Sequence, residues 1–204
     1  MSATPPDARK APAAARNREP ILAVLGPLLT GPARVVEIAA GSGEHSLWFA
    51  TALPEVTWQP TDRDPAALAS IAAWREAEGP ANLLAPIALD AGDRRTWPDA
   101  PVDAIVCINM IHIAPWSAAE GLMALAGERL PSGGLLFLYG PYLEDDVETA
   151  PGNLAFDADL RARNPQWGIR RREAVEALAA SHGLTLEGRT AMPANNLSLA
   201  FRKG

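Results

Sequence analysis

The stretch VVEIAAGSGEHS leads from an apolar segment into a glycine-rich turn flanked by acids, and it is the clearest candidate ligand site in this chain. Gly41 and Gly43 have no side chains, so a ligand can approach the backbone closely there. A dinucleotide motif would place a third glycine where this chain has Ser46. Glu37 and Glu44 flank the turn and would repel a pyrophosphate. The stretch therefore favours a ligand that carries positive charge.

Two more acids follow segments that we predict to be strands. Asp62 ends TWQPTD and Asp90 ends IALD. The carboxyl ends of parallel strands meet at one edge of a sheet, so both acids are expected near the glycine turn. An acid at the position of Asp62 can hydrogen-bond ribose hydroxyls, and Asp90 could accept from an adenine amino group. Each could instead be a solvated strand-end or capping residue. Since S-adenosylmethionine (SAM) has a sulfonium and an ammonium but no phosphate, the acids favour it.

Methyl transfer requires in-line alignment, and an oxygen or nitrogen nucleophile must also lose a proton. His112 follows the fourth predicted strand and titrates near neutrality, so it is our candidate general base. Packing against Trp116 is its structural alternative. Tyr139 and Tyr142, in LYGPY, are predicted to bind substrate at the catalytic site through their hydroxyls, or else to be packing aromatics.

Other candidates surround these positions. Asn109 does not begin the motif by which DNA and glutamine methyltransferases hold a planar amino group, because Met-Ile-His follows it. Residues 143–169 are predicted to form a lid over the substrate, with an ordinary connecting helix as the alternative. Additional cofactor contacts are expected from Arg16, Asn17, His45 and Asn109. Substrate contacts are expected from Met110, Trp116, Phe156, Arg161, Trp167 and Asn195.

Composition limits the classes of function. The chain has 204 residues and a net charge of -6, which favours one domain without a nucleic-acid-binding surface. Its single cysteine excludes an internal disulfide or a cysteine zinc cluster, and we expect no metal. We find neither a signal core nor a membrane span, so a cytoplasmic protein with a small-molecule partner is expected. The sequence does not indicate the oligomeric state.

Strand and helix patterns alternate along most of the chain, which predicts a Rossmann-like α/β sheet covered on both faces. The last two strands have no helix between them and should form an antiparallel hairpin. Asp64 before Pro65 predicts a helix cap, and Ser117 with Glu120 predicts a capping box. Residues 1–15 are expected to be a flexible arm before a domain at 16–204. The predicted helices are 19–30, 45–53, 65–78, 117–130, 153–163 and 173–182, and the strands are 34–39, 56–59, 85–89, 103–109, 135–139, 184–190 and 197–201.

The pattern over roughly residues 18–202 resembles class I SAM-dependent methyltransferases. The segments RNREPIL, NMIHIAPW, LYGPY, NPQWGIR and MPANNL resemble, more specifically, the methyltransferase-like 26 family. The resemblance implies a doubly wound seven-stranded sheet with a C-terminal antiparallel hairpin, but no settled substrate. It also implies contacts from the arm around Asn17 and cofactor roles for Glu37, Gly41, Gly43, Asp62 and Asp90.

We therefore expect a SAM-dependent methyltransferase that acts on a small molecule and yields S-adenosylhomocysteine. The accepting atom, oxygen, nitrogen or sulfur, stays open. Two alternatives remain at this point: an NAD(P)-dependent oxidoreductase, and a SAM-binding protein without turnover of its own.

Overall fold

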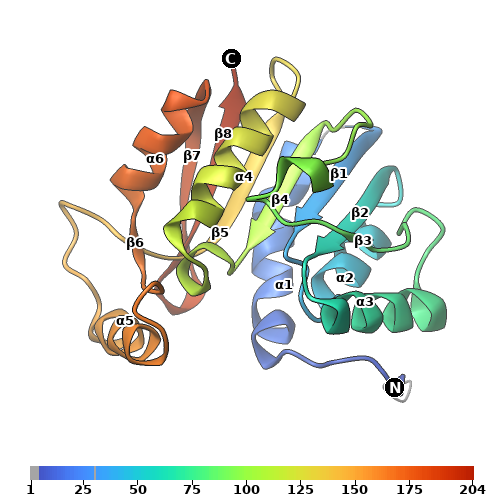
Figure 1. The fold of residues 1–204 in the computed structure, drawn as a ribbon, viewed down its shortest axis with the longest axis horizontal. Helices are drawn as coiled ribbons and strands as arrows, with labels where there is room; N and C mark the ends of the chain where they lie inside the picture. The colour runs from blue at the N-terminus through green and yellow to red at the C-terminus, as the bar shows by residue number, and fades with distance from the viewer. Residues whose placement is uncertain (1–4, 30) are drawn as a thin grey trace.

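One mixed sheet forms the centre of the molecule (Figure 1). The computed structural model describes residues 5–29 and 31–204. The strand order is β3-β2-β1-β4-β5-β8-β7, and β6 pairs with β5 beside this path. All pairs are parallel except β5 with β8 and β8 with β7. The strands are β1 (Ala33–Ile38), β2 (Val56–Asp62), β3 (Ile87–Ala88), β4 (Ala104–Ile108), β5 (Leu135–Leu143), β6 (Arg170–Arg171), β7 (Leu184–Met192) and β8 (Asn196–Lys203).

The sheet confirms the predicted α/β class and the terminal antiparallel hairpin. Seven strands lie on the main path, as expected, and β6 is an addition that the sequence did not predict. It contains only Arg170 and Arg171, which pair with Tyr142 and Leu143 of β5. Two residues are too few to show the alternation that marks a strand.

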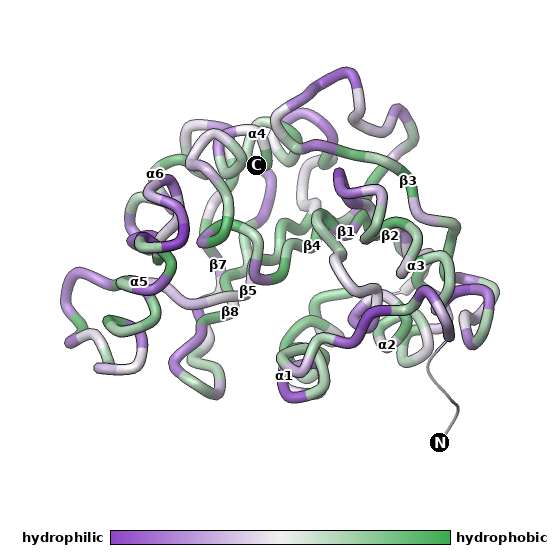
Figure 2. Tube along the Cα trace, turned by 60° about the horizontal axis from the view of Figure 1, so that its bottom comes forward, coloured by the Kyte–Doolittle hydropathy of each residue, from purple (hydrophilic) through white to green (hydrophobic). Residues whose placement is uncertain are grey.

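Helices cover both faces of the sheet and enclose two hydrophobic layers. On one face α1 and α2 pack against strand residues such as Val106 and Phe137, and on the other α4 and α6 pack against Ile105 and Phe201. Successive residues of β4 contribute to opposite layers because side chains alternate along a strand. Figure 2 shows the hydrophobic central strands between these groups of helices. The α-helices are α1 (Pro12–Leu25), α2 (Glu44–Ala52), α3 (Pro65–Glu78), α4 (Trp116–Arg129), α5 (Pro151–Arg163) and α6 (Arg172–Ser181).

Short 3-10 turns complete the structure, namely η1 (Gly26–Leu28), η2 (Arg94–Thr96), η3 (Ile111–Ile113) and η4 (Pro193–Asn195). Of the helices in the described ranges, none is long and apolar enough to cross a membrane.

The N-terminal segment differs from the predicted arm. Helix α1 begins at Pro12, so the expected boundary between residues 15 and 16 falls inside a helix. Proline is tolerated in a first turn, and the three alanines that follow are strong helix formers. Residues 1–4 of the predicted arm lie outside the described residues. The segment before α1 runs along α3, where the indole of Trp74 donates to the carbonyl of Arg9 at 3.1 Å (Figure 1).

The two predicted helix caps had different outcomes. Asp64 caps α3 as predicted, and its carboxylate accepts from the backbone N–H of Ala66 at 3.0 Å. The capping box at Ser117 is wrong, because α4 begins one residue earlier and its N-cap is Pro115. The helix already includes Trp116, the residue before Ser117, so Ser117 lies inside the first turn and not at the N-cap.

Candidate active site

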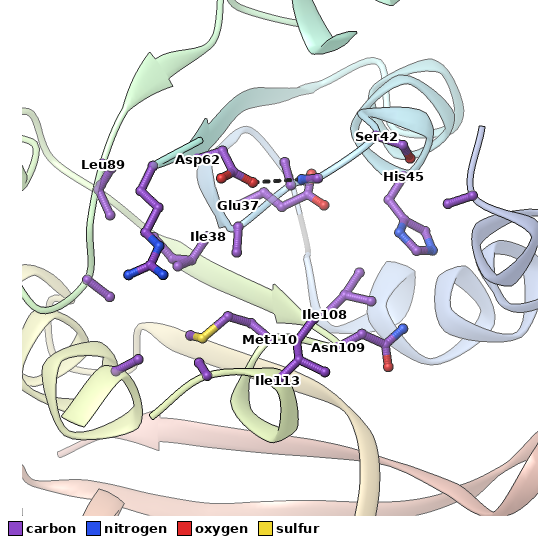
Figure 3. Close-up of a pocket in the computed structure, with 18 of the residues that line it drawn as sticks. Glu37, Ile38, Ser42, His45, Asp62, Leu89, Ile108, Asn109, Met110 and Ile113 are labelled. Atoms are coloured by element: carbon purple, nitrogen blue, oxygen red, sulfur yellow. Dashed lines mark hydrogen bonds between the residues drawn. The ribbon is translucent and has the colours of Figure 1, made fainter. Parts of the chain in front are cut away.

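A cavity of about 430 Å³ lies at the carboxyl ends of β1, β2 and β4 (Figure 3). Strands β2 and β4 flank β1 on opposite sides, which makes this the point where strand order reverses and α/β sheets bind ligands. Its volume is in the range of small-molecule sites. The lining residues are Ala11, Ala13, Ala14, Glu37, Ile38, Ala39, Ala40, Gly41, Ser42, His45, Asp62, Arg63, Leu89, Asp90, Ala91, Ile108, Asn109, Met110, Ile113, Ala114 and Ala118.

The two glycines of the turn have different surroundings. Gly41 lines the cavity at φ +60°, and its N–H donates to Asp62 Oδ2 at 2.9 Å. Gly43 lies against α3 instead. A Cβ at Gly43 would stand 2.9 Å from Cα of Ile71, which is too close for any side chain. Close packing of two helices therefore accounts for Gly43, whereas Gly41 opens the backbone to a ligand.

Glu37 is a buried carboxylate on the cavity wall, 1% exposed. Its Oε2 accepts from the hydroxyl of Ser46 at 2.6 Å and from the indole of Trp58 at 2.7 Å. Burial raises the pKa of Glu37 to about 7, and these two hydrogen bonds oppose the rise. Ser46, which stands where a dinucleotide motif has glycine, thus fixes the acid. A cation in the cavity would stabilise the ionised form of Glu37.

The other two predicted acids also reach the cavity. Asp62 accepts from the N–H groups of Gly41 and Asp64, each at 2.9 Å. Asp90 accepts from the N–H of Gly92 at 2.9 Å and lies 3.5 Å from Arg63, in an exposed pair. Backbone donors therefore fix both carboxylates at their strand ends.

Glu44 does not line the cavity. Its carboxylate accepts from the N–H of Ala11 and from the Ser42 hydroxyl, so it ties the N-terminal segment to the glycine turn. Ser70 adds a second link, because its hydroxyl accepts from the N–H of Arg9 at 2.8 Å and donates to the carbonyl of Ser42 at 2.7 Å. This segment supplies alanines to the cavity wall, whereas Arg16 lies on an exposed side of α1.

His45 lines the cavity and hydrogen-bonds Asn17 of α1, with Nε2 2.8 Å from Oδ1. Both residues are buried, and the His45 ring stacks on Phe49 at 5.5 Å between centroids. Burial, with a smaller contribution from Arg18, lowers the pKa of His45 to about 4. The ring is therefore neutral at pH 7.

His112 is buried beside the cavity and does not line it. Its neighbours are Gly140, where an added Cβ would lie 3.3 Å from Nδ1, and Phe156, whose ring is edge-on at 5.8 Å. Burial, and to a lesser degree Arg170, lowers the pKa of His112 to about 4. Because His112 is buried and does not line the cavity, the structure does not place it in contact with an acceptor bound there.

The two candidate tyrosines project to opposite faces of β5. Tyr139 packs in the α1 layer and Tyr142 in the α4 layer, and burial raises the pKa of each phenol. Tyr142 and Asn195 line a second cavity of about 190 Å³. In the predicted lid, Arg161 pairs with Asp157 at 2.7 Å.

The structure brings only part of the predicted site together. Strand ends and the glycine turn supply the predicted residues that line the main cavity: Glu37, Gly41, His45, Asp62, Asp90, Asn109 and Met110. The predicted residues that do not line it are Arg16, Asn17, Gly43, His112, Trp116, Tyr139, Tyr142, Phe156, Arg161, Trp167 and Asn195.

Sequence reasoning predicted Met110 but missed the isoleucines of the apolar wall. Ile38 and Ile108 are the last residues of β1 and β4, and Ile113 follows in η3. A strand end at the sheet edge is a usable signal for the first two, but nothing in the sequence distinguishes Ile113 from a core residue. Among the described residues, no cluster of three or more metal-ligating side chains is placed to hold a metal ion.

Solved structures with the same fold include several methyltransferases. An O-methyltransferase family protein from Burkholderia thailandensis is 16% identical with a TM-score of 0.80, and the match covers 94% of this chain and 57% of that one. Human N-acetylserotonin methyltransferase in complex with SAM is 12% identical with a TM-score of 0.77, over 94% and 53%. An O-methyltransferase family 2 protein from Planctomyces limnophilus in complex with apigenin is 20% identical with a TM-score of 0.74, over 92% and 61%.

At these identities the likeness establishes a shared fold, and this chain spans little more than half the length of each of those proteins. The resemblance to the methyltransferase-like 26 family stays a prediction. A family model described as "Protein of unknown function (DUF938)" matches residues 8–203. The chain belongs to this DUF938 family.

Proposed function

We propose that this protein is a SAM-dependent methyltransferase that acts on a small molecule. The observation that carries the proposal is the arrangement of Glu37, Asp62 and Asp90 around one cavity beside Gly41. Three carboxylates favour a cationic ligand, and among the described residues the one arginine on the wall, Arg63, lies next to Asp90. The shared methyltransferase fold supports the same conclusion.

The residues present suit the parts of this cofactor. Asp62 is held by two backbone N–H groups at the end of β2, where a carboxylate can accept from both ribose hydroxyls. Asp90, one strand further, is available to an adenine amino group. Glu37 faces the cationic part, and in the described chain its Oε1 accepts no hydrogen bond. When bound, SAM supplies an activated methyl group, and the protein binds, aligns and excludes water.

An acceptor of small size fits the other side of the cavity. Ile108, Met110 and Ile113 form an apolar wall there, and alanines of α1 also line the cavity. Similar proteins include one solved with apigenin and one named for N-acetylserotonin, both small ring compounds. We infer a small acceptor with an apolar body.

The alternatives are separated by binding measurements. An NAD(P)-dependent oxidoreductase would have to place a pyrophosphate beside Glu37, against like charge. We expect isothermal titration calorimetry to show binding of SAM and S-adenosylhomocysteine and no binding of NAD+ or NADPH. Asp62→Ala should weaken SAM binding at least tenfold. Asp93→Ala is the matched control, because Asp93 pairs with Arg95 in an exposed turn outside the cavity. Binding of NAD+ in place of SAM would refute the proposal.

Turnover separates an enzyme from a protein that only binds the cofactor. SAM with a labelled methyl group should transfer label to at least one member of a panel of phenols, carboxylates, thiols and amines, with S-adenosylhomocysteine as the second product. Tight SAM binding without label transfer to any class would favour a binding protein.

A further inference from the structure

Uncharged polar side chains meet at the end of the main cavity that lies against α1. His45 and Asn109 are at this end, away from Leu89 at the other (Figure 3), and Asp90 follows Leu89 directly. Asn17 does not line the cavity, but its side chain hydrogen-bonds both the His45 ring and the Tyr139 hydroxyl. Figure 3 shows Glu37 between the two ends of the cavity, so the uncharged side chains gather at the α1 end beyond this acid.

The bond between Asn17 and His45 fixes where the imidazole carries its proton. The Asn17 amide is oriented with Oδ1 toward the imidazole, and since an amide oxygen can only accept, this orientation assigns the proton between the two residues to Nε2. A neutral imidazole with its proton on Nε2 has a lone pair on Nδ1. Because burial lowers the His45 pKa to about 4, the ring has this neutral form at pH 7. Stacking on Phe49 restrains the ring further.

The lone pair on Nδ1 is available to a ligand. Within residues 5–29 and 31–204, no group hydrogen-bonds Nδ1, and this atom is not among the fully enclosed polar atoms without a partner. The His45 side chain lines the cavity. A hydrogen-bond acceptor that points into a ligand site selects a ligand with a matching donor.

We propose that Asn17 is a positioning residue that holds His45 with its proton on Nε2, so that Nδ1 accepts a hydrogen bond from the hydroxyl, thiol or amine of the methyl acceptor. The inference rests on the proposed function and narrows its substrate class. The acceptor carries a hydrogen on its nucleophilic atom when it binds, which excludes carboxylates.

Nitrogen NMR of the imidazoles tests the positioning role without any turnover. The chain has three histidines, and loss of one set of signals in His45→Gln identifies His45. In the wild-type protein we expect a single tautomer with the proton on Nε2. Asn17→Ala should give a mixture of tautomers, whereas Asn17→Asp should keep the wild-type tautomer, since a carboxylate also accepts from Nε2. Asn153→Ala is the matched control, because Asn153 is also 8% exposed but hydrogen-bonds Asn195 outside this cavity.

A wild-type proton on Nδ1, or an unchanged tautomer in Asn17→Ala, would overturn the inference. Should Asn17→Ala fail to fold, Asn17→Asp still decides, because its carboxylate must raise the His45 pKa if the two side chains are bonded. Phenol and anisole, added to protein saturated with S-adenosylhomocysteine, test the ligand contact. Phenol should shift the Nδ1 signal and anisole should not, and equal effects or none would overturn the donor assignment. Failure of S-adenosylhomocysteine to bind would refute the proposed function instead, and the tautomer result would stand.

Discussion

Glu37, for which we propose a cofactor contact, is an acid in an unfavourably buried position, and its neighbours explain how this burial is tolerated. Ser46 and Trp58 both donate to Oε2, yet burial still raises the pKa of Glu37 to about 7. A cationic ligand binds the ionised form better. Between pH 5.5 and 7.5 we therefore expect SAM affinity to fall as the pH is lowered, by about tenfold per unit below 7. Calorimetry across this range measures it.

Glu37→Gln is the control for that pH dependence. The variant should bind SAM more weakly at pH 7.5, and its SAM affinity should change little with pH.

The raised pKa of Glu37 also makes the stability of the fold depend on pH. The folded pKa lies above the ordinary 4.5, so the stabilisation from the protonated acid is complete below pH 4.5 and is lost as the pH rises through about 7. Wild-type affinity that is flat across the range would contradict the assigned role of Glu37.

Ala39 stores backbone strain directly before the glycine turn. Its φ of +56° is in the left-handed region, which a residue with a Cβ rarely adopts. Ala39→Gly should raise the free energy of unfolding by about 1 kcal/mol in urea titrations. Ala40→Gly, one residue on and outside that region, should lower it. A destabilised Ala39→Gly would mean that the lost methyl contacts outweigh the strain.

At the scale of elements, the segment before α1 couples the N-terminus to the glycine turn. Glu44 accepts from the N–H of Ala11, and Trp74 donates to the carbonyl of Arg9. Glu44→Ala should release the segment, so that trypsin cleaves after Arg9 and Lys10 several times faster. Mass spectrometry of timed digests measures the cleavage. Glu76→Ala, on α3 and exposed, should leave it unchanged. Equal rates in both variants would show that Glu44 does not hold the segment.

Local sequence signals predicted the elements better than they predicted the site. Asp64 before Pro65 identified a helix start because the cap and proline act within one turn. The acids at the ends of β1 and β2 were predictable because parallel strands end at one edge. His112 shows the limit. Its sequence position places it near that edge, but burial under Phe156 depends on how α5 packs, and no local pattern encodes this.

The whole molecule has two hydrophobic layers that share one sheet, and this should make unfolding cooperative. Phe201 lies in the α4 and α6 layer, and Trp58, fully buried, lies in the other. Strand β8 lies between β5 and β7, so loss of the terminal hairpin would leave β5 at the edge of the sheet and would expose both hydrophobic layers to solvent there. Phe201→Ala should lower the free energy of unfolding by about 3–5 kcal/mol.

That destabilisation should reach the distant layer as well. Urea curves followed by circular dichroism and by tryptophan fluorescence should shift together in Phe201→Ala and stay coincident. Val147→Ala is the control and should change stability by less than about 0.5 kcal/mol, since Val147 is 53% exposed. Because Trp97 belongs to the layer of Phe201 and Trp58 to the other, a fluorescence curve that splits into two transitions would mean that the two layers unfold separately. In that case the carboxyl edge of β1 and β2 would keep Glu37 and Asp62, the proposed cofactor residues, in place without the terminal hairpin.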